Sequence, residues 1–329
     1  MEANLLKSAQ NIATCDGESR YHVVALPELP HKLGISADGF PMFFVMVSDH
    51  DRLIRNLNAE LLSVEYNVLC NIVEEEGVFD NQRFTIITLR SENEQLQKMF
   101  VDVFLMMLIT IPKTPSNIEI ATKVESLLSI FSKLKRKPIH KLQGLWAELF
   151  MIEQSNNPTT IAGAWHSQIG SKYDFTMGED KIEVKSTSSE ERVHRFSLDQ
   201  LNPSENSRLL ICSVVVRESA KSANGISVYD LYNKIAEKIH DTETKIHVYE
   251  VMTETLGSDF NSARKKHFDY IEACDRLAFY DHHDVPKIDK SVIPEHVSEV
   301  KFSANLSHLV DIRIKGFDCG NSSLFNALF

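Results

Sequence analysis

Short apolar segments separated by turn residues occupy much of the first 115 positions of the chain. The segments are rich in β-branched and aromatic side chains, as is typical of strands, and they lie at 21–26, 41–47, 61–72 and 83–89. Turn signals such as Asp38-Gly39 separate them. An acidic start, which suits the positive end of a helix dipole, indicates a helix over about 92–110. We predict a β-rich, mostly antiparallel N-terminal domain over residues 1–115.

Helical spacing of apolar residues replaces this pattern at residues 117–136. The basic run at 133–137 suits a helix C-terminus, and Pro138 ends the helix. We predict a connecting helix within residues 116–138. The basic run is interpreted as a solvated helix end, with a phosphate-contacting patch as the alternative.

From residue 139 onward, helical and strand patterns alternate, which favours a mixed sheet flanked by helices. The predicted helices are 139–154, 197–201, 228–240 and 259–267. The predicted strands are a hairpin at 172–187 and segments at 209–217, 246–251, 270–281, 297–304 and 309–315. We predict that residues 139–329 form one α/β domain with a C-terminal strand extension, so the whole chain combines α+β and α/β architecture.

The composition is that of an ordinary globular protein, with 329 residues, 43% hydrophobic and 25% charged, a length that suits two domains. Its net charge of −11 differs from that of a strong autonomous DNA-binding protein, so DNA would be met by local basic patches or with a partner. Five dispersed cysteines without a CxxC pair indicate reduced thiols. The N-terminus lacks a signal-peptide pattern and the longest apolar run, 103–111, is too short to span a bilayer, so we expect a cytoplasmic protein.

One candidate functional side chain lies on the helix predicted at 139–154. Leu142, Leu145, Leu149 and Ile152 share one face of that helix, at about 100° per residue. Glu148 falls about 80° from the centre of this face, so we expect it at the edge of the packed surface, where it reaches toward the sheet. A border glutamate without a function is the alternative.

The predicted hairpin contributes three more charged side chains. Strand alternation predicts that Asp174 points away from Tyr173 and Phe175, and that Glu183 and Lys185 share one face. Pairing of the two strands around a Gly-Glu-Asp turn then places Asp174, Glu183 and Lys185 side by side. Carboxylates hold Mg²⁺ beside a substrate phosphate, and a lysine near them can place or deprotonate the attacking water. The set predicts metal-dependent phosphodiester hydrolysis, and the alternative is a salt-bridged exposed hairpin.

The order helix Glu, strand Asp and strand Glu-x-Lys resembles the PD-(D/E)XK nuclease superfamily, which implies a restriction-endonuclease-like fold. More closely, the chain is similar to a bacterial family of PD-(D/E)XK motif proteins of unknown function, often encoded beside restriction and phage-defence genes. The resemblance covers most of the chain and is weakest in the first 115 residues. The segments that carry it are Gly-Leu-Trp-Ala-Glu-Leu at 144–149, Trp165, Tyr-Asp-Phe at 173–175, Ile-Glu-Val-Lys-Ser at 182–186 and His-Arg-Phe-Ser-Leu-Asp-Gln-Leu at 194–201.

The resemblance implies roles for individual residues. Asp174 and Glu183 would be metal ligands, and Glu148 an auxiliary ligand, direct or through water. Lys185 would be the catalytic lysine. The metal would be Mg²⁺, with Mn²⁺ as a substitute. Tyr173 precedes Asp174 in place of the superfamily's proline, which is commonly lost.

Other residues are weaker candidates. The resemblance implies Gln200 at the edge of the site, against a phosphate or a metal-bound water, with a helix-surface glutamine as an equal alternative. Arg192, His194 and Arg195 are candidate DNA contacts, although we favour an exposed basic loop there. Trp165 is expected in the core.

Two further motifs are not expected to act. His282-His283 should not bind one ion, because adjacent side chains on a strand or loop point apart. The Arg-Lys-Lys-His run at 264–267 is interpreted as a solvated helix face, with a second DNA-holding patch as the alternative.

These features predict a Mg²⁺-dependent DNA endonuclease of a prokaryotic restriction or phage-defence system. RNA is a further substrate that the residue set accommodates. A homodimer and partner proteins from the same operon are expected by analogy with restriction-type nucleases. The alternative is a non-catalytic DNA-binding or scaffold subunit of a defence complex, which the acidic net charge favours and the intact Asp174, Glu183 and Lys185 set disfavours.

Overall fold

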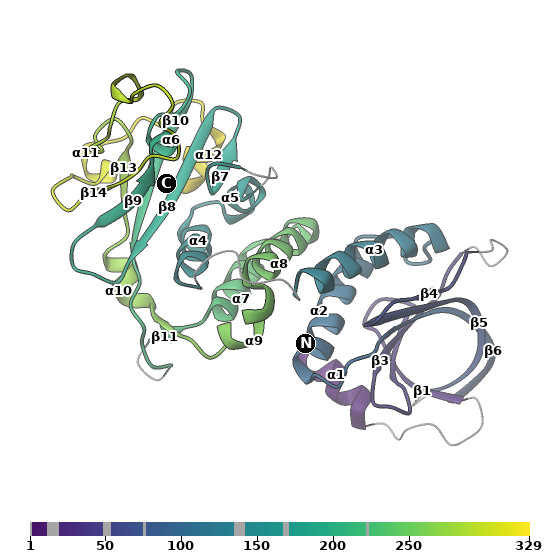
Figure 1. Ribbon diagram of the computed structural model, residues 1–329. Coiled ribbons are helices and arrows are strands. Elements are labelled where there is room, and N and C mark those ends of the chain that lie inside the picture. Colours follow the sequence, from purple (N-terminus) through teal and green to yellow (C-terminus); the bar gives the residue numbers. More distant parts are fainter. Residues whose placement is uncertain are drawn as a thin grey trace. The chain divides into compact units, whose positions relative to one another are not determined.

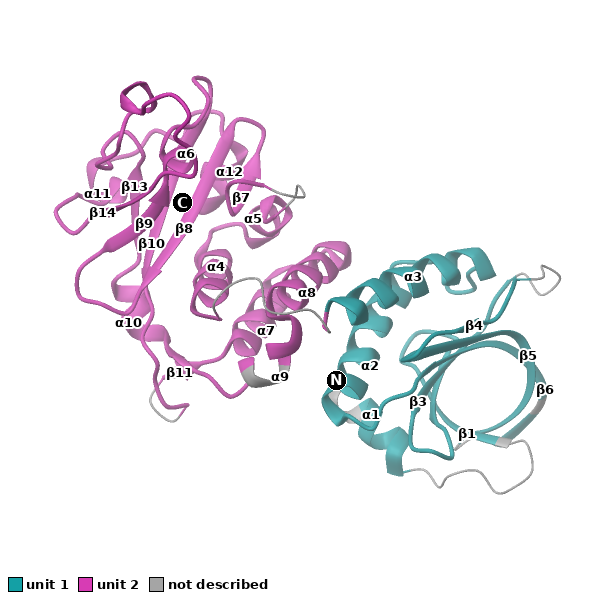
Figure 2. Ribbon diagram, viewed as in Figure 1, with its two compact units in different colours: residues 1–133 teal, residues 134–329 magenta. Residues whose placement is uncertain are grey.

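The computed structural model describes residues 2–11, 20–48, 54–74, 77–134, 142–166, 171–221 and 224–329. The chain divides into two compact units, residues 1–133 and 134–329 (Figure 2). No helix within the described ranges is long and apolar enough to cross a membrane. The cysteines at described positions are free, whereas Cys15 and the basic residues 135–137 lie outside the described residues.

The first unit is built on a sheet that closes on itself (Figure 1). Helix α1 (Glu2–Asn11) precedes six strands: β1 (Arg20–Ala25), β2 (Lys32–Ile35), β3 (Pro41–Val45), β4 (Leu57–Asn58), β5 (Leu62–Glu74) and β6 (Gly77–Leu89). The strand order is β1-β2-β3-β6-β5-β4, and β1 also pairs in parallel with β5, which closes the ring. The segments predicted as strands coincide with β1, β3, β5 and β6, whereas α1 and the short β2 and β4 were not predicted.

Two helices complete the first unit, α2 (Glu94–Ile109) and α3 (Asn117–Lys133). The Asn93 side chain caps α2 by accepting backbone N–H groups of its first turn. Phe100 and Phe104 of α2 pack on Phe43 of β3, with ring centroids 5.3 and 4.9 Å apart. These aromatic contacts fix α2 against the sheet and form part of the core of this unit.

The second unit contains a mixed four-stranded sheet flanked by helices (Figure 1), as predicted. Its strands are β7 (Phe175–Met177), β8 (Asp180–Thr187), β10 (Arg208–Val215) and β13 (Ala278–Asp281). The order is β13-β10-β8-β7, with β8 and β10 parallel and the other two pairs antiparallel. Helices α4 (Leu142–Gln154), α5 (Pro158–Ala164) and α12 (Ser323–Leu328) pack against β7, β8 or both.

A second layer covers one face of this sheet. Strand β9 (Val193–Ser197) pairs with β14 (Lys301–Asn305) and leads directly into α6 (Leu198–Leu201). Phe196 and Leu201 from this layer join Leu209, Ile211 and Tyr280 of the sheet in one buried cluster. The remaining elements are α7 (Val228–Lys238), α8 (Thr242–Leu256), α9 (Phe260–Ala263), α10 (Tyr270–Asp275), α11 (Ile312–Lys315), the strand pair β11 (Gly225–Ile226) and β12 (Phe268–Asp269), and 3-10 turns at 257–259 and 290–292.

The strand predicted at 246–251 is wrong, because this segment lies inside helix α8. Its β-branched residues suggested a strand, but Val248, Met252 and Leu256 lie four residues apart and are all buried on one helical face. The Asp241 side chain accepts the Thr244 N–H and starts the helix.

Other C-terminal predictions also need correction. Residues 270–275 form helix α10 and the strand begins only at Ala278, while 312–315 form helix α11 instead of a strand. The side chains of Asp269 and Asp311 accept backbone N–H groups at the starts of these helices. The helix predicted over 259–267 is limited to α9, and the strand predicted at 297–304 is β14. In these short segments, the helix-starting effect of an aspartate N-cap therefore outweighs the strand preference of the apolar residues.

Candidate active site

The carboxylates of Asp174 and Glu183 come together at the β7–β8 hairpin. Phe175 pairs with Ile182, so Asp174, one residue before β7, lies beside Glu183 on β8. The Asp174 carboxylate accepts a hydrogen bond from the Val184 backbone N–H, with an Oδ2–N distance of 2.7 Å. This bond anchors the first acid to the strand that presents the second.

The residues just before β7 form a bend, which corrects the predicted alternation. Tyr173 packs in the same core cluster as Ile211 on β10. Phe175 instead aligns with Ile182, which neighbours Leu210 and so points to the other face of the sheet. Tyr173 and Phe175 therefore do not share a face, because strand geometry begins only at Phe175.

Lys185 and Gln200 both contact Glu183. Lys185 Nζ lies 2.6 Å from Glu183 Oε1, and Gln200 Nε2 donates to the same oxygen at 2.6 Å. Gln200 Oε1 is 3.5 Å from Lys185 Nζ and also accepts the Ser197 N–H, in a capping box that starts α6. The structure thus brings Gln200 to the acid–lysine pair through the local geometry of a helix start.

Glu148 reaches the same region from α4. Its Oε2 accepts a hydrogen bond from Trp165 Nε1 at 2.8 Å and lies 3.2 Å from His166 Nε2. One ligand atom each from Glu148, His166 and Asp174 fall within 4.8 Å of one another. Trp165 is fully buried, as expected, but it also orients a candidate ligand. His166 was missed by sequence reasoning, and its only signal there was its position next to Trp165.

The electrostatics of the site are those of crowded, desolvated acids. Burial, and then the nearby Glu183 and Glu148, raise the pKa of Asp174 well above its ordinary value, against the opposing effects of the Val184 N–H and Lys185. Burial also raises the pKa of Glu183, with Lys185 opposing and Glu148 adding to the shift. Glu183 Oε2 is buried and has no hydrogen-bond partner among the residues that the structure describes. A divalent cation takes such oxygen ligands and relieves their repulsion, so the donor set fits a metal ion.

The predicted DNA-contacting residues lie on or beside β9. His194 is buried, with Nε2 2.8 Å from Ser213 Oγ, and burial together with Lys185 and Arg192 lowers its pKa to about 4. The Arg192 guanidinium donates to the Ser213 carbonyl at 3.0 Å, whereas Arg195 is exposed. The interpretation as an exposed basic loop is therefore wrong, because residues 193–197 form a strand whose alternate side chains point inward.

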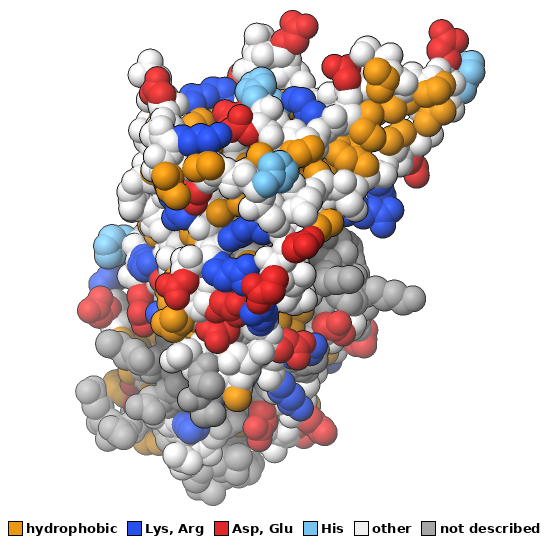
Figure 3. Space-filling view, turned by 90° about the vertical axis from the view of Figure 1, so that its left-hand side faces the viewer, with side chains coloured by type: hydrophobic (Ala, Val, Ile, Leu, Met, Phe, Trp, Pro, Cys, Tyr) orange, Lys and Arg blue, Asp and Glu red, His pale blue; other side chains and the backbone are white. Residues whose placement is uncertain are grey.

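Several basic side chains elsewhere in the second unit are paired with acids. Lys266, from the predicted basic patch, lies 2.8 Å from Glu218, and Arg276 lies 2.8 Å from Glu190. The face drawn in Figure 3 has Lys and Arg side chains interspersed with Asp and Glu side chains. This mixture agrees with the acidic net charge of the chain.

The prediction that the side chains of His282 and His283 point apart is wrong. Their ring centroids lie 3.9 Å apart, and with Asp281 they bring ligand atoms within 4.8 Å of one another. The two histidines lie in a turn after β13, where adjacent side chains do not alternate as they do in a strand.

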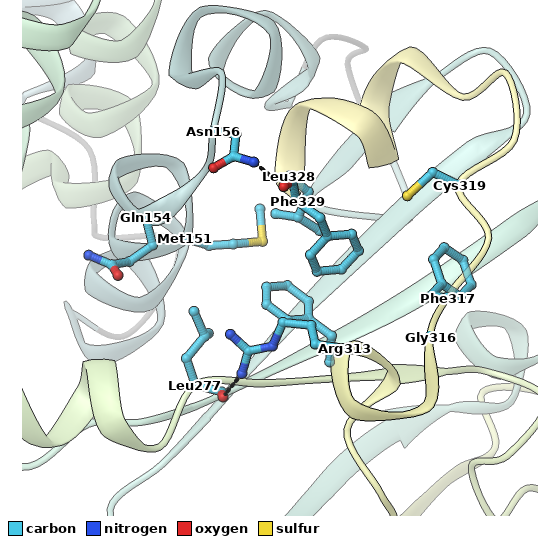
Figure 4. A pocket seen from close by; sticks show the side chains of 11 residues that line it. Met151, Gln154, Asn156, Leu277, Arg313, Gly316, Phe317, Cys319, Leu328 and Phe329 are labelled. Atoms are coloured by element: carbon cyan, nitrogen blue, oxygen red, sulfur yellow. Dashed lines mark hydrogen bonds between the residues drawn. The ribbon is translucent and has the colours of Figure 1, made fainter.

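The second unit also contains a pocket of about 520 Å³ that none of the candidate site residues lines. Met151 and Phe329 contribute apolar walls to it (Figure 4), and Phe279 also lines it. Its arginine, Arg313, donates to the Leu277 carbonyl (Figure 4). Arg313 also pairs with Asp311, so its charge is satisfied within the protein. Among the described residues that line this pocket, Arg313 is therefore committed to partners of its own and not to an anion.

Comparisons with known proteins identify one family. A family model described as "Putative PD-(D/E)XK family member, (DUF4420)" matches residues 14–307. No match was found among curated proteins or among solved structures. The matched range includes the acids, the lysine and the glutamine described above.

Proposed function

The chain belongs to this PD-(D/E)XK family, and from that membership we propose that it is a metal-dependent endonuclease that hydrolyses phosphodiester bonds of DNA. The observation that supports the proposal best is the group formed by Asp174, Glu183 and Lys185. Two desolvated acids, one with an unsatisfied buried oxygen, lie next to a lysine held at 2.6 Å. An exposed salt-bridged hairpin would show neither the burial nor the raised acid pKa values.

Each residue has a role in this proposal. Asp174, Glu183 and Glu148 would hold Mg²⁺ or Mn²⁺, and the ion would supply Lewis-acid activation of the phosphate and of a water. Lys185 presents its ammonium at the edge of the acid group, where it stabilises negative charge that develops on the phosphate. Gln200 positions both Lys185 and Glu183 through its side-chain amide.

The test is cleavage of supercoiled and linear DNA in Mg²⁺ or Mn²⁺. Asp174→Ala and Lys185→Ala are expected to lose cleavage. Lys181→Ala is the matched control, because Lys181 lies on the same strand and its Nζ contacts the Gly178 carbonyl instead of the site. Cleavage that survives in both site variants would contradict the proposal. A parallel reaction with single-stranded RNA tests the alternative substrate.

We extend the proposal to a prokaryotic restriction or phage-defence system in the cytoplasm, with a homodimer and operon partners as the working assembly. The family resemblance supports this setting. A non-catalytic DNA-binding or scaffold subunit is the second candidate, and the net charge of −11 and the interspersed charges in Figure 3 favour it. A salt titration of DNA affinity, run beside the cleavage assay, separates the candidates: a nuclease binds DNA in a metal- and salt-sensitive way and cleaves it, a DNA-binding subunit binds without cleaving, and a scaffold does neither. Absence of both affinity and cleavage, with the predicted partners present, would favour the scaffold.

A further inference from the structure

His166 lies in the candidate site but has no role in the proposed hydrolysis. Its backbone has a φ of +43°, in the left-handed region that non-glycine residues rarely adopt. Its backbone N–H donates to the Asp174 carbonyl at 2.9 Å, next to an isolated bridge between Trp165 and Phe175. The chain thus holds an unfavourable conformation that places this imidazole beside β7.

The imidazole of His166 lies among the acids of the site. Its Nε2 is 3.2 Å from Glu148 Oε2, and a ring nitrogen together with oxygens of Glu148 and Asp174 fall within 4.8 Å of one another. His166 also acts electrostatically on Glu183. One ion can therefore collect this nitrogen and the carboxylate oxygens after small side-chain shifts.

We propose that His166 is a nitrogen ligand of the metal centre and makes that centre prefer Mn²⁺ to Mg²⁺. The inference rests on the proposed function, because it uses the same acids. Mg²⁺ takes oxygen ligands and retains several waters, whereas first-row transition ions accept imidazole nitrogen readily. A site of carboxylates alone would offer no such basis for discrimination.

The test is electron spin-echo spectroscopy of Mn²⁺ bound to the full chain, which detects coupling to a ligating ¹⁴N nucleus. The unsubstituted protein is expected to show nitrogen coupling that changes when its histidines carry ¹⁵N. His166→Gln is expected to lose the coupling and about tenfold in Mn²⁺ affinity, with Mg²⁺ affinity little changed. His283→Gln is the matched control, since it removes the exposed ligand of the other His/Asp group and should leave the coupling intact.

Three outcomes decide the matter. If Mn²⁺ binding depends on Asp174 but shows no nitrogen coupling, His166 is not a ligand, and the proposed metal centre is still supported. Coupling that persists in a folded His166→Gln protein overturns the assignment as well. Failure of both Mn²⁺ and Mg²⁺ to bind the unsubstituted protein overturns the metal centre and this inference together. If His166→Gln does not fold, coupling that is retained in His283→Gln and lost in Asp174→Asn still assigns the nitrogen to this site.

Discussion

Asp174→Asn is expected to stabilise the metal-free protein while it removes metal-dependent stabilisation. The Asp174 carboxylate is partly buried, and burial with the neighbouring Glu183 and Glu148 raises its pKa. Asparagine retains an oxygen that can accept the Val184 N–H, now bonded at 2.7 Å. The substitution therefore removes the charge and preserves the hydrogen bond.

The magnitude follows from the geometry. Ligand oxygens of Asp174 and Glu148 lie within 4.8 Å, where two unit charges repel by about 3.5 kcal/mol at an effective dielectric constant of about 20. Against this, the hydrogen bond from Val184 loses its charge assistance, at a cost of about 1 kcal/mol, and the attraction to Lys185 is lost. A net stabilisation of about 1–2 kcal/mol remains, which raises Tm by about 2–8 °C for a unit of this size.

The assay is thermal unfolding at pH 7.5 with a chelator and with excess Mn²⁺. The unsubstituted protein should gain about 2.7 kcal/mol at a hundredfold excess of Mn²⁺ over its Kd, and Asp174→Asn should gain little. Asp180→Asn is the control, because Asp180 lies on the same hairpin and has no contact to the acids among the described interactions. It should change neither the Tm in the chelator nor the Tm in Mn²⁺. A lower Tm for Asp174→Asn in the chelator would refute the reasoning from repulsion.

Three further predictions concern the groups around the acids. Trp165→Phe removes the 2.8 Å bond to Glu148 and should lower Mn²⁺ affinity about tenfold in calorimetry, whereas Trp146→Phe, which loses a 2.9 Å bond to a backbone carbonyl, should not change it. His194 has a folded pKa of about 4 against an ordinary 6.5, so the unfolded chain takes up the proton first as pH falls. Stability should therefore decrease from about pH 6.5 to pH 4 by up to about 3 kcal/mol, and denaturant titrations of His194→Gln should show a flatter profile. Gln200→Leu removes half of the capping box, so it should lower the free energy of unfolding by about 1 kcal/mol, and it should also slow DNA cleavage. A loss of stability without slower cleavage would show that Gln200 has only a structural role.

The hairpin part of the site was accessible from the sequence because its geometry is local. Asp174, Glu183 and Lys185 lie within twelve residues, and strand pairing around one turn is enough to bring them together. Helix geometry was enough to predict that Glu148 turns away from water, although residues 145–153 of α4 are buried on every side and not on one face alone. Gln200 reached the site through a capping box, another local motif.

The placement of the other residues depends on tertiary contacts, which the periodicity of the sequence does not predict. His166 approaches the acids through a left-handed backbone and a hydrogen bond to the Asp174 carbonyl. His194 looked basic and exposed, but pairing of β9 with β14 turns it inward to Ser213. The β-branched residues at 246–251 predicted a strand, but the segment is helical because burial of one helical face outweighs local propensity in α8.

The closed sheet of the first unit has consequences for the order in which that unit folds. β1 joins β5 through pairs such as Tyr21 with Ile72, which are about fifty positions apart, whereas the β5–β6 hairpin is local. The hairpin should therefore form early and β1 should be added late, since distant pairings slow folding. β1 is also the strand that covers edges of both β2 and β5. Until it is in place, these edges are open to strands of other chains, which makes the late step the one most exposed to aggregation.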